Sequence, residues 1–281
     1  MAIKDILVHI DSTQRGESSL KIAISVAKRS DAHLIVLFVV SRPAILEHLR
    51  GQAVQRMSEE MYANGVRIAD IYKAEMEREG ISSEWRMVDQ PGLSLNEVTE
   101  HVVLNSRCVD LVVLGQHNPH RADAGLPADL ADRVVLGGGA PVLVIPYVGE
   151  YVLDEIRAMI AWDGGRESAR AVRGALPLLV SAQKAVVVAV NPYKGNPATQ
   201  AKASADEVRL HLARHNIDAT AQHVVNDELG IGDSLLSRAA DEGINLMISG
   251  AYHNSRTREK LLGGVTRQLL EQMTLPVLMS N

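Results

Sequence analysis

The chain has 281 residues, of which 46% are hydrophobic, 22% charged and only 3% aromatic, and its formal net charge is -5 at pH 7. This length suits two domains with aliphatic cores, and the acidic balance argues against a nucleic-acid-binding surface, which usually carries a basic excess. The single cysteine excludes an internal disulfide, and no apolar run is long enough to cross a bilayer. Because the N-terminus also has no signal-peptide pattern, we expect a cytoplasmic protein.

The first half of the chain alternates short apolar runs with helical patterns. Residues 6–10, 34–40 and 110–114 are nearly continuous in Ile, Leu and Val, which is typical of strands buried on both faces of a parallel sheet. Between the first two runs, residues 16–30 place apolar side chains at helical spacing. Strands separated by helices predict right-handed βαβ units in a doubly wound sheet.

The second half repeats the first. Both halves have an apolar run that ends in Asp, then a polar turn, a helical pattern and a second apolar run. In both, a proline follows the strand-ending glycine by 26 residues, from Gly115 to Pro141 and from Gly250 to Pro276. The matching stretches are 5–40 and 158–190, 110–118 and 245–253, and 140–146 and 275–281. Such agreement is hard to obtain by chance, so it indicates an internal duplication.

The duplication predicts two tandem α/β domains, residues 1–148 and 152–281, each a doubly wound open parallel sheet. The first domain carries an additional helical arm, residues 44–80, which we expect to form one long helix or two. Its apolar side contains Met57, Met61, Ile68 and Ile71. This stripe either packs on its own domain or offers a partner an adaptable, Met-rich surface.

Ligands of open parallel sheets bind outside the carboxyl ends of the strands, where the strand order reverses. The residues that follow the expected strands are therefore candidates for a site: Asp11 and Asp163, Val40 and Val190, and the loops after Gly115 and Gly250. An Asp before a polar turn and a helix is also an ordinary cap or turn residue. Each of the two aspartates therefore has a structural as well as a functional interpretation.

At these residues the sequence resembles the universal stress protein family in its tandem form. The resemblance rests on "ILVHID" and "MIAWD", on "DLVVLG" and "NLMISG", and on the terminal "PVLVIP" and "PVLM", and it covers almost the whole chain in two copies. It implies a Rossmann-like fold and a role in the stress response. It also implies that the last strands pair about a two-fold axis, here as an intramolecular pseudo-dimer with pseudo-two-fold symmetry, with homodimerisation as a further possibility.

Members of this family that bind ATP carry G-x-x-G-x9-G-[S/T] after the fourth strand. The second half matches it at Gly250 and Gly263, whereas His253 replaces the second glycine and Gly264 stands at the hydroxyl position. Residues 250–267 hold four basic residues against one acidic residue, which favours a polyanion. The resemblance thus implies a weakened site for ATP or another adenine nucleotide, with Mg²⁺ accompanying the phosphates. Its expected residues are Asp163, Val190, Gly250, His253, Gly263, Gly264 and Thr266.

The first half departs further from the motif. Asn118 replaces the second glycine, and Asp129 stands where the hydroxyl residue belongs. Because a carboxylate aimed at a phosphate is repulsive, we expect this half to have lost triphosphate binding. The residues of this degenerate counterpart are Asp11, Val40, Gly115, Asn118 and Asp129.

Nothing in the sequence nominates a catalytic residue, because neither a G-x-S-x-G turn nor a full P-loop occurs. His117, His120 and Asp123 follow one another at spacings of three, but all lie in one expected loop, so we predict no metal site. The favoured hypothesis is a stress-response binding or regulatory protein. The alternatives are a slow ATP-hydrolysing switch, a protein-interaction module that uses the arm 44–80, and a carrier of another small ligand.

Overall fold

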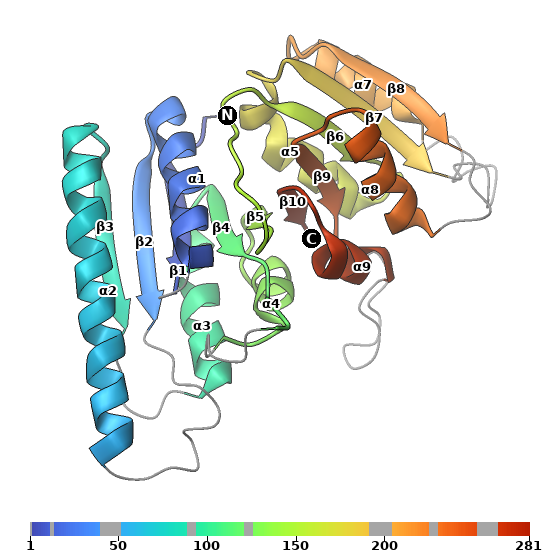
Figure 1. Cartoon of the computed structure of the whole chain (residues 1–281). Coiled ribbons are helices and arrows are strands. Elements are labelled where there is room, and N and C mark those ends of the chain that lie inside the picture. The colour runs from blue at the N-terminus through green and yellow to red at the C-terminus, as the bar shows by residue number, and fades with distance from the viewer. Residues whose placement is uncertain are drawn as a thin grey trace. The chain divides into compact units, whose positions relative to one another are not determined.

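The computed structural model describes residues 2–11, 14–39, 52–88, 94–120, 126–190, 204–224, 230–251 and 264–281. The chain divides into two compact units, Ala2–Tyr147 and Val148–Asn281. In Figure 1 the first unit is coloured from blue to green and the second from yellow-green to red. Strands and helices alternate in both units and the paired strands are parallel, so the predicted α/β fold is confirmed.

The N-terminal unit contains a parallel sheet with the strand order β3-β2-β1-β4-β5 in its described part. The strands are β1 (Asp5–Ile10), β2 (His33–Val39), β3 (Ser83–Val88), β4 (Leu111–Gly115) and β5 (Val142–Ile145). The helices are α1 (Gln14–Ser30), α2 (Gln52–Arg78), α3 (Leu95–Asn105), the 3-10 turn η2 (Ser106–Cys108) and α4 (Leu130–Gly137). The strand order reverses between β1 and β4.

The C-terminal unit repeats this architecture, with β8-β7-β6-β9-β10 as its strand order. Its strands are β6 (Arg157–Ala161), β7 (Lys184–Val190), β8 (Ala219–Val224), β9 (Leu246–Gly250) and β10 (Val277–Ser280). Its helices are α5 (Arg166–Leu179), α7 (Ala205–Ala213), α8 (Ile231–Asp241) and α9 (Gly264–Gln272). The reversal of strand order therefore falls between β6 and β9.

Both faces of the central strands are buried, which explains their continuous apolar runs. Leu7 and Val113 in the first unit, and Met159 and Ile248 in the second, have no exposed surface. The cores are built almost entirely from aliphatic side chains, as the low aromatic content predicts.

The duplication extends to single hydrogen bonds. Asp110 Oδ2 accepts from the backbone nitrogens of Lys4 and Asp5, at 2.7 and 3.1 Å. In the second unit its counterpart, Asn245, accepts at Oδ1 from the backbone nitrogen of Arg157, at 2.8 Å. In each unit, therefore, the residue before the fourth strand uses its side chain to hold the start of the first.

The helical arm predicted over 44–80 is a single helix, α2, in its described part. Its buried face contains Gly65, Ile68, Ala69, Tyr72 and Met76, and Gly65 lies against the ring of Phe38. The prediction was wrong for Ile71, which is 58% exposed. Six residues from Gly65, it lies about 120° around the helix from the centre of the buried face. The side chains of Met57 and Met61 are outside the described part.

Across the described ranges, none of the helices has both the length and the hydropathy of a membrane span.

Candidate functional site

A pocket of about 230 Å³ lies at the carboxyl ends of the central strands of the C-terminal unit. The strand order reverses there, between β6 and β9, which is the usual place for a ligand in an open parallel sheet. The lining residues are Ala161, Trp162, Asp163, Val188, Val190, Ile231, Leu235, Ser249, Gly250, Gly264, Val265 and Thr266.

Most of the residues that the sequence nominates in this half line that pocket. They come from four elements or their ends: β6, β7, β9 and α9. The five are Asp163, Val190, Gly250, Gly264 and Thr266. The other two, His253 and Gly263, lie outside the described residues.

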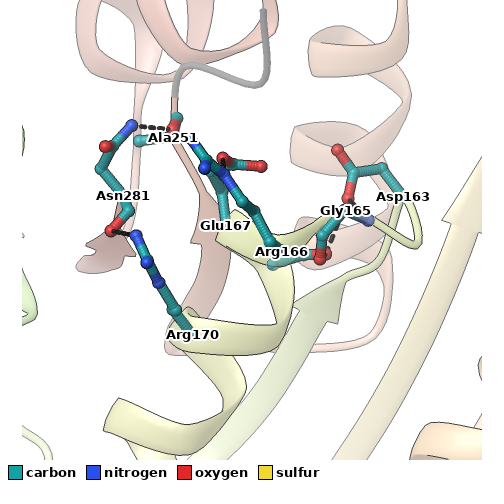
Figure 2. Close-up of polar contacts among 8 residues, drawn as sticks. Asp163, Gly165, Arg166, Glu167, Arg170, Ala251 and Asn281 are labelled. Atoms are coloured by element: carbon teal, nitrogen blue, oxygen red, sulfur yellow. Dashed lines mark hydrogen bonds and ion pairs between the residues drawn. The ribbon is translucent and has the colours of Figure 1, made fainter.

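Asp163 follows β6 and is exposed, and its carboxylate has a structural task (Figure 2). Its Oδ1 accepts hydrogen bonds from the backbone nitrogen of Gly165 at 2.8 Å and from Ser168 Oγ at 2.7 Å. These contacts fix the turn into α5, as the capping interpretation of the sequence predicts. Its Oδ2 has no hydrogen bond within the described part of the chain. One carboxylate oxygen therefore stabilises the turn into α5, and the other can accept a hydrogen bond from a ligand.

Two described glycines, Gly250 at a glycine position of the motif and Gly264 at its hydroxyl position, have different structural environments. A Cβ on Gly250 would lie 2.4 Å from the backbone nitrogen of Ser168 and 2.7 Å from the carbonyl carbon of Glu167, so packing against α5 requires glycine there. A Cβ on Gly264 would meet nothing within 4 Å among the described residues, and this glycine does not have a positive φ. Neither packing nor backbone conformation therefore requires glycine at 264.

The start of α9 forms one side of the pocket. Gly264, Val265 and Thr266 are the first three residues of this helix, and all three line the pocket. The first N–H groups of an α-helix have no intrahelical acceptor, and they attract anions together with the helix dipole. Because Gly264 has no side chain, the main chain there is open to a ligand.

Much of the remaining lining of the pocket is apolar. Val188 and Val190 of β7 contribute to it, together with Ile231 and Leu235 of α8 and Trp162 after β6. A wall of this kind suits a flat ring. The sequence analysis nominates Val190, and Trp162 lies in the stretch "MIAWD", whereas no motif marks the other three residues. Val188 could have been predicted from Val190, because residues two apart on a strand lie on the same face. The residues of α8 could not, because α8 carries no motif.

In the N-terminal unit, the residue at the position of Gly264 belongs to a polar network. Asp129 precedes α4, and its Oδ2 accepts from Arg133 Nε at 2.7 Å. Arg133 Nη1 donates to Asn96 Oδ1 of α3, at 2.8 Å. In the duplicated unit, glycines correspond to two of these residues: Gly264 to Asp129, by its spacing from the strand-ending glycine, and Gly232 to Asn96, as the second residue of the matching helix. In the N-terminal unit, therefore, the position that corresponds to Gly264 carries an ion-paired carboxylate.

Two of the remaining candidates of the first half, Asp11 and Gly115, lie at the carboxyl ends of the paired strands β1 and β4. Asp11 is buried after β1, where a Cβ on Gly16 would lie 2.5 Å from its carbonyl oxygen. Gly115 ends β4, and Asn118 Oδ1 accepts from the backbone nitrogen of His120 at 2.9 Å in a local turn. Val40 lies outside the described residues. Among the side chains that the structure describes, no three potential metal ligands cluster.

Comparison with known proteins gives matches in structure. No family model matches the sequence, and no curated protein matches it. A universal stress protein from Archaeoglobus fulgidus DSM 4304 is similar over 99% of this chain and 96% of its own, with a TM-score of 0.72 and 13% identity. A functionally unknown protein from Pseudomonas aeruginosa PAO1 is similar over 99% and 92%, with a TM-score of 0.63 and 17% identity.

A third solved structure, a candidate universal stress protein from Pseudomonas aeruginosa UCBPP-PA14, is similar over 99% of this chain and 93% of its own. Its TM-score is 0.65 and its identity 16%. At such identities the matches establish architecture. The chain has the tandem fold of the universal stress proteins, as its sequence predicts.

Proposed function

We propose that the chain is a stress-response binding protein of the universal stress type, and that its C-terminal unit binds an adenine nucleotide. The tandem fold supports the first part. One observation carries the second part: a single pocket at the reversal of strand order joins the described residues that the nucleotide motif nominates. A protein-interaction module without a small-molecule site does not account for that convergence.

The pocket offers a different environment to each part of a nucleotide. The base would lie against the apolar side formed by Val188, Val190 and Leu235. A ribose hydroxyl would donate to Asp163 Oδ2, and the phosphates would approach the start of α9 at Gly264. Asp163 is the only carboxylate among the described lining residues, so an accompanying Mg²⁺ would be held mainly by phosphates and water.

We propose one nucleotide per chain. In the N-terminal unit, Asp129 places a carboxylate at the start of α4. At the equivalent position of the C-terminal unit, Gly264 has no side chain and leaves the main chain of α9 open. Arg133 forms an ion pair with this carboxylate of Asp129. A phosphate would have to displace an existing ion pair to bind there.

Calorimetric titration of the full, nucleotide-stripped chain with ATP, ADP and AMP tests the proposal. We expect saturable binding at about one site per chain. Gly264→Asp introduces into the C-terminal unit the residue found at the equivalent position 129 of the N-terminal unit, and it should abolish the binding of ATP. Asp129→Gly is the matched control and should leave C-terminal binding unchanged. Absence of binding up to millimolar concentrations of all three nucleotides would overturn the proposal.

A further inference from the structure

The first two residues of α5 form an ion pair of unusual asymmetry. Arg166 Nε donates to Glu167 Oε1. The Glu167 side chain is only 4% exposed, whereas the Arg166 side chain is 75% exposed. A buried carboxylate at a helix N-terminus is stabilised by the helix dipole, so it is a fixed anchor for the flexible arginine.

This ion pair lies beside the pocket. Arg166 follows Asp163, a lining residue, by three positions, and the Glu167 carbonyl carbon is 2.7 Å from where a Cβ on Gly250 would be. Figure 2 shows the Arg166 side chain directed from the start of α5 toward Ala251, next to the Glu167 carboxylate. The guanidinium is therefore held near the end of β9, at the edge of the pocket that Gly250 forms.

The ion pair with Glu167 leaves the two terminal nitrogens of Arg166 able to donate to a ligand. Only Nε is engaged, and the two terminal nitrogens have no hydrogen bond among the described residues. Those two nitrogens form a planar fork that matches two oxygens of a phosphate. By contrast, Arg170, one turn further along α5, donates a hydrogen bond from Nη1 to the backbone oxygen of Asn281, at 2.8 Å.

We propose that Arg166 is a phosphate-binding residue of the C-terminal pocket and that Glu167 positions it. The inference rests on the proposed nucleotide function and deepens it. Compared with the nucleotide motif, the sequence lacks one donor and carries one bulkier residue, because Gly264 replaces the hydroxyl residue and His253 replaces the second glycine. A guanidinium supplied from α5 compensates for the lost hydroxyl donor. The pocket then selects nucleotides over nucleosides through a residue outside the motif.

The test compares adenosine with AMP, ADP and ATP, titrated into the full chain and its variants. Arg166→Gln should weaken ATP binding roughly ten- to a hundredfold, the range expected for a lost charge-assisted hydrogen bond, and leave adenosine binding unchanged. Glu167→Gln should lower ATP affinity with the same selectivity, because it releases the guanidinium. Arg166→Lys should give an intermediate loss, since it keeps the charge without the fork.

Arg173→Gln is the matched control, because Arg173 is an exposed arginine about two turns along the same helix. It should change neither affinity. If the wild-type chain binds ATP and Arg166→Gln binds it equally well, or loses adenosine and ATP alike, the inference is wrong while the proposed function stands. If the wild-type chain binds none of the four ligands, the proposed function itself fails. The slope of ATP affinity against salt, which should be shallower in Arg166→Gln, gives a second readout.

Discussion

The α carbon of Gly250 packs so closely against α5 that a methyl group on it would lie 2.4 Å from the backbone nitrogen of Ser168. The end of β9 and the first turn of α5 are thus in direct main-chain contact. Since Gly250 lines the pocket and Ser168 donates to Asp163, this contact links two walls of the site. The glycine that the nucleotide motif marks here is also a packing requirement of the fold.

Gly250→Ala should therefore destabilise the C-terminal unit by about 1–3 kcal/mol, because backbone atoms cannot move aside as a side chain can. Urea unfolding of the full chain measures the loss. Gly264→Ala is the control, since its methyl group meets nothing within 4 Å among described atoms. It should change the free energy of unfolding by no more than about 0.5 kcal/mol, or raise it slightly. Equal losses in the two variants would contradict the packing argument.

Substitutions can distinguish the hydrogen-bond acceptor of Asp163 from its negative charge. Asp163→Asn keeps an acceptor at the Oδ1 position for Gly165 and Ser168, so the free energy of unfolding should stay close to that of the wild type. Asp163→Ala removes the acceptor and should cost about 1–2 kcal/mol. Chemical unfolding of both variants tests this. A loss in Asp163→Asn as large as that in Asp163→Ala would mean that the negative charge, and not the acceptor, holds the turn.

Much of the fold was predictable because the central strands are buried on both faces. The runs 6–10 and 34–40 correspond to β1 and β2 within a residue or two, since only aliphatic side chains suit both faces. The edge strand β3 was not recognised, because it is only partly buried and carries an ion pair between Glu84 and Arg86. Pairing of the two copies through 140–146 and 275–281 stays a prediction.

The site was predictable where a residue follows a strand and not where tertiary packing supplies it. Asp163 and Gly250 were found because their places at strand ends are visible in the sequence. Ile231 and Leu235 were missed, since nothing in α8 shows that its first turns reach the pocket. The network at Asp129 was missed as well, because Asn96 joins it from a distant helix.

Trp162 should report ligand binding directly. It lines the pocket, and the chain's other tryptophan, Trp85, belongs to the N-terminal unit. In a Trp85→Phe chain, ATP should change the emission of Trp162 with the same midpoint as calorimetry. A Trp162→Phe chain, which retains Trp85, should show no change. A response of the same size in both chains would place the ligand elsewhere or indicate a non-specific effect.

The stability of the C-terminal unit should fall in acid through Glu242. Glu242 accepts from Lys184 Nζ at 2.8 Å and pairs with Arg238 Nε at 3.1 Å. Partial burial acts to raise the pKa of Glu242, but the hydrogen bonds from Lys184 and Gln222 and the charges of Lys184 and Arg238 outweigh it, so the pKa lies below its ordinary value.

Because the folded-state pKa of Glu242 is the lower one, its contribution is complete above the unfolded-state pKa and disappears as the pH falls through the folded-state value. Glu242→Gln should lower the free energy of unfolding by about 1 kcal/mol at pH 7 and have little effect in strong acid. Urea unfolding of the Trp85→Phe chain, followed by Trp162 emission, isolates the C-terminal unit. If wild type and variant differed equally at pH 7 and pH 3, the loss would come from packing and not from the charge of Glu242.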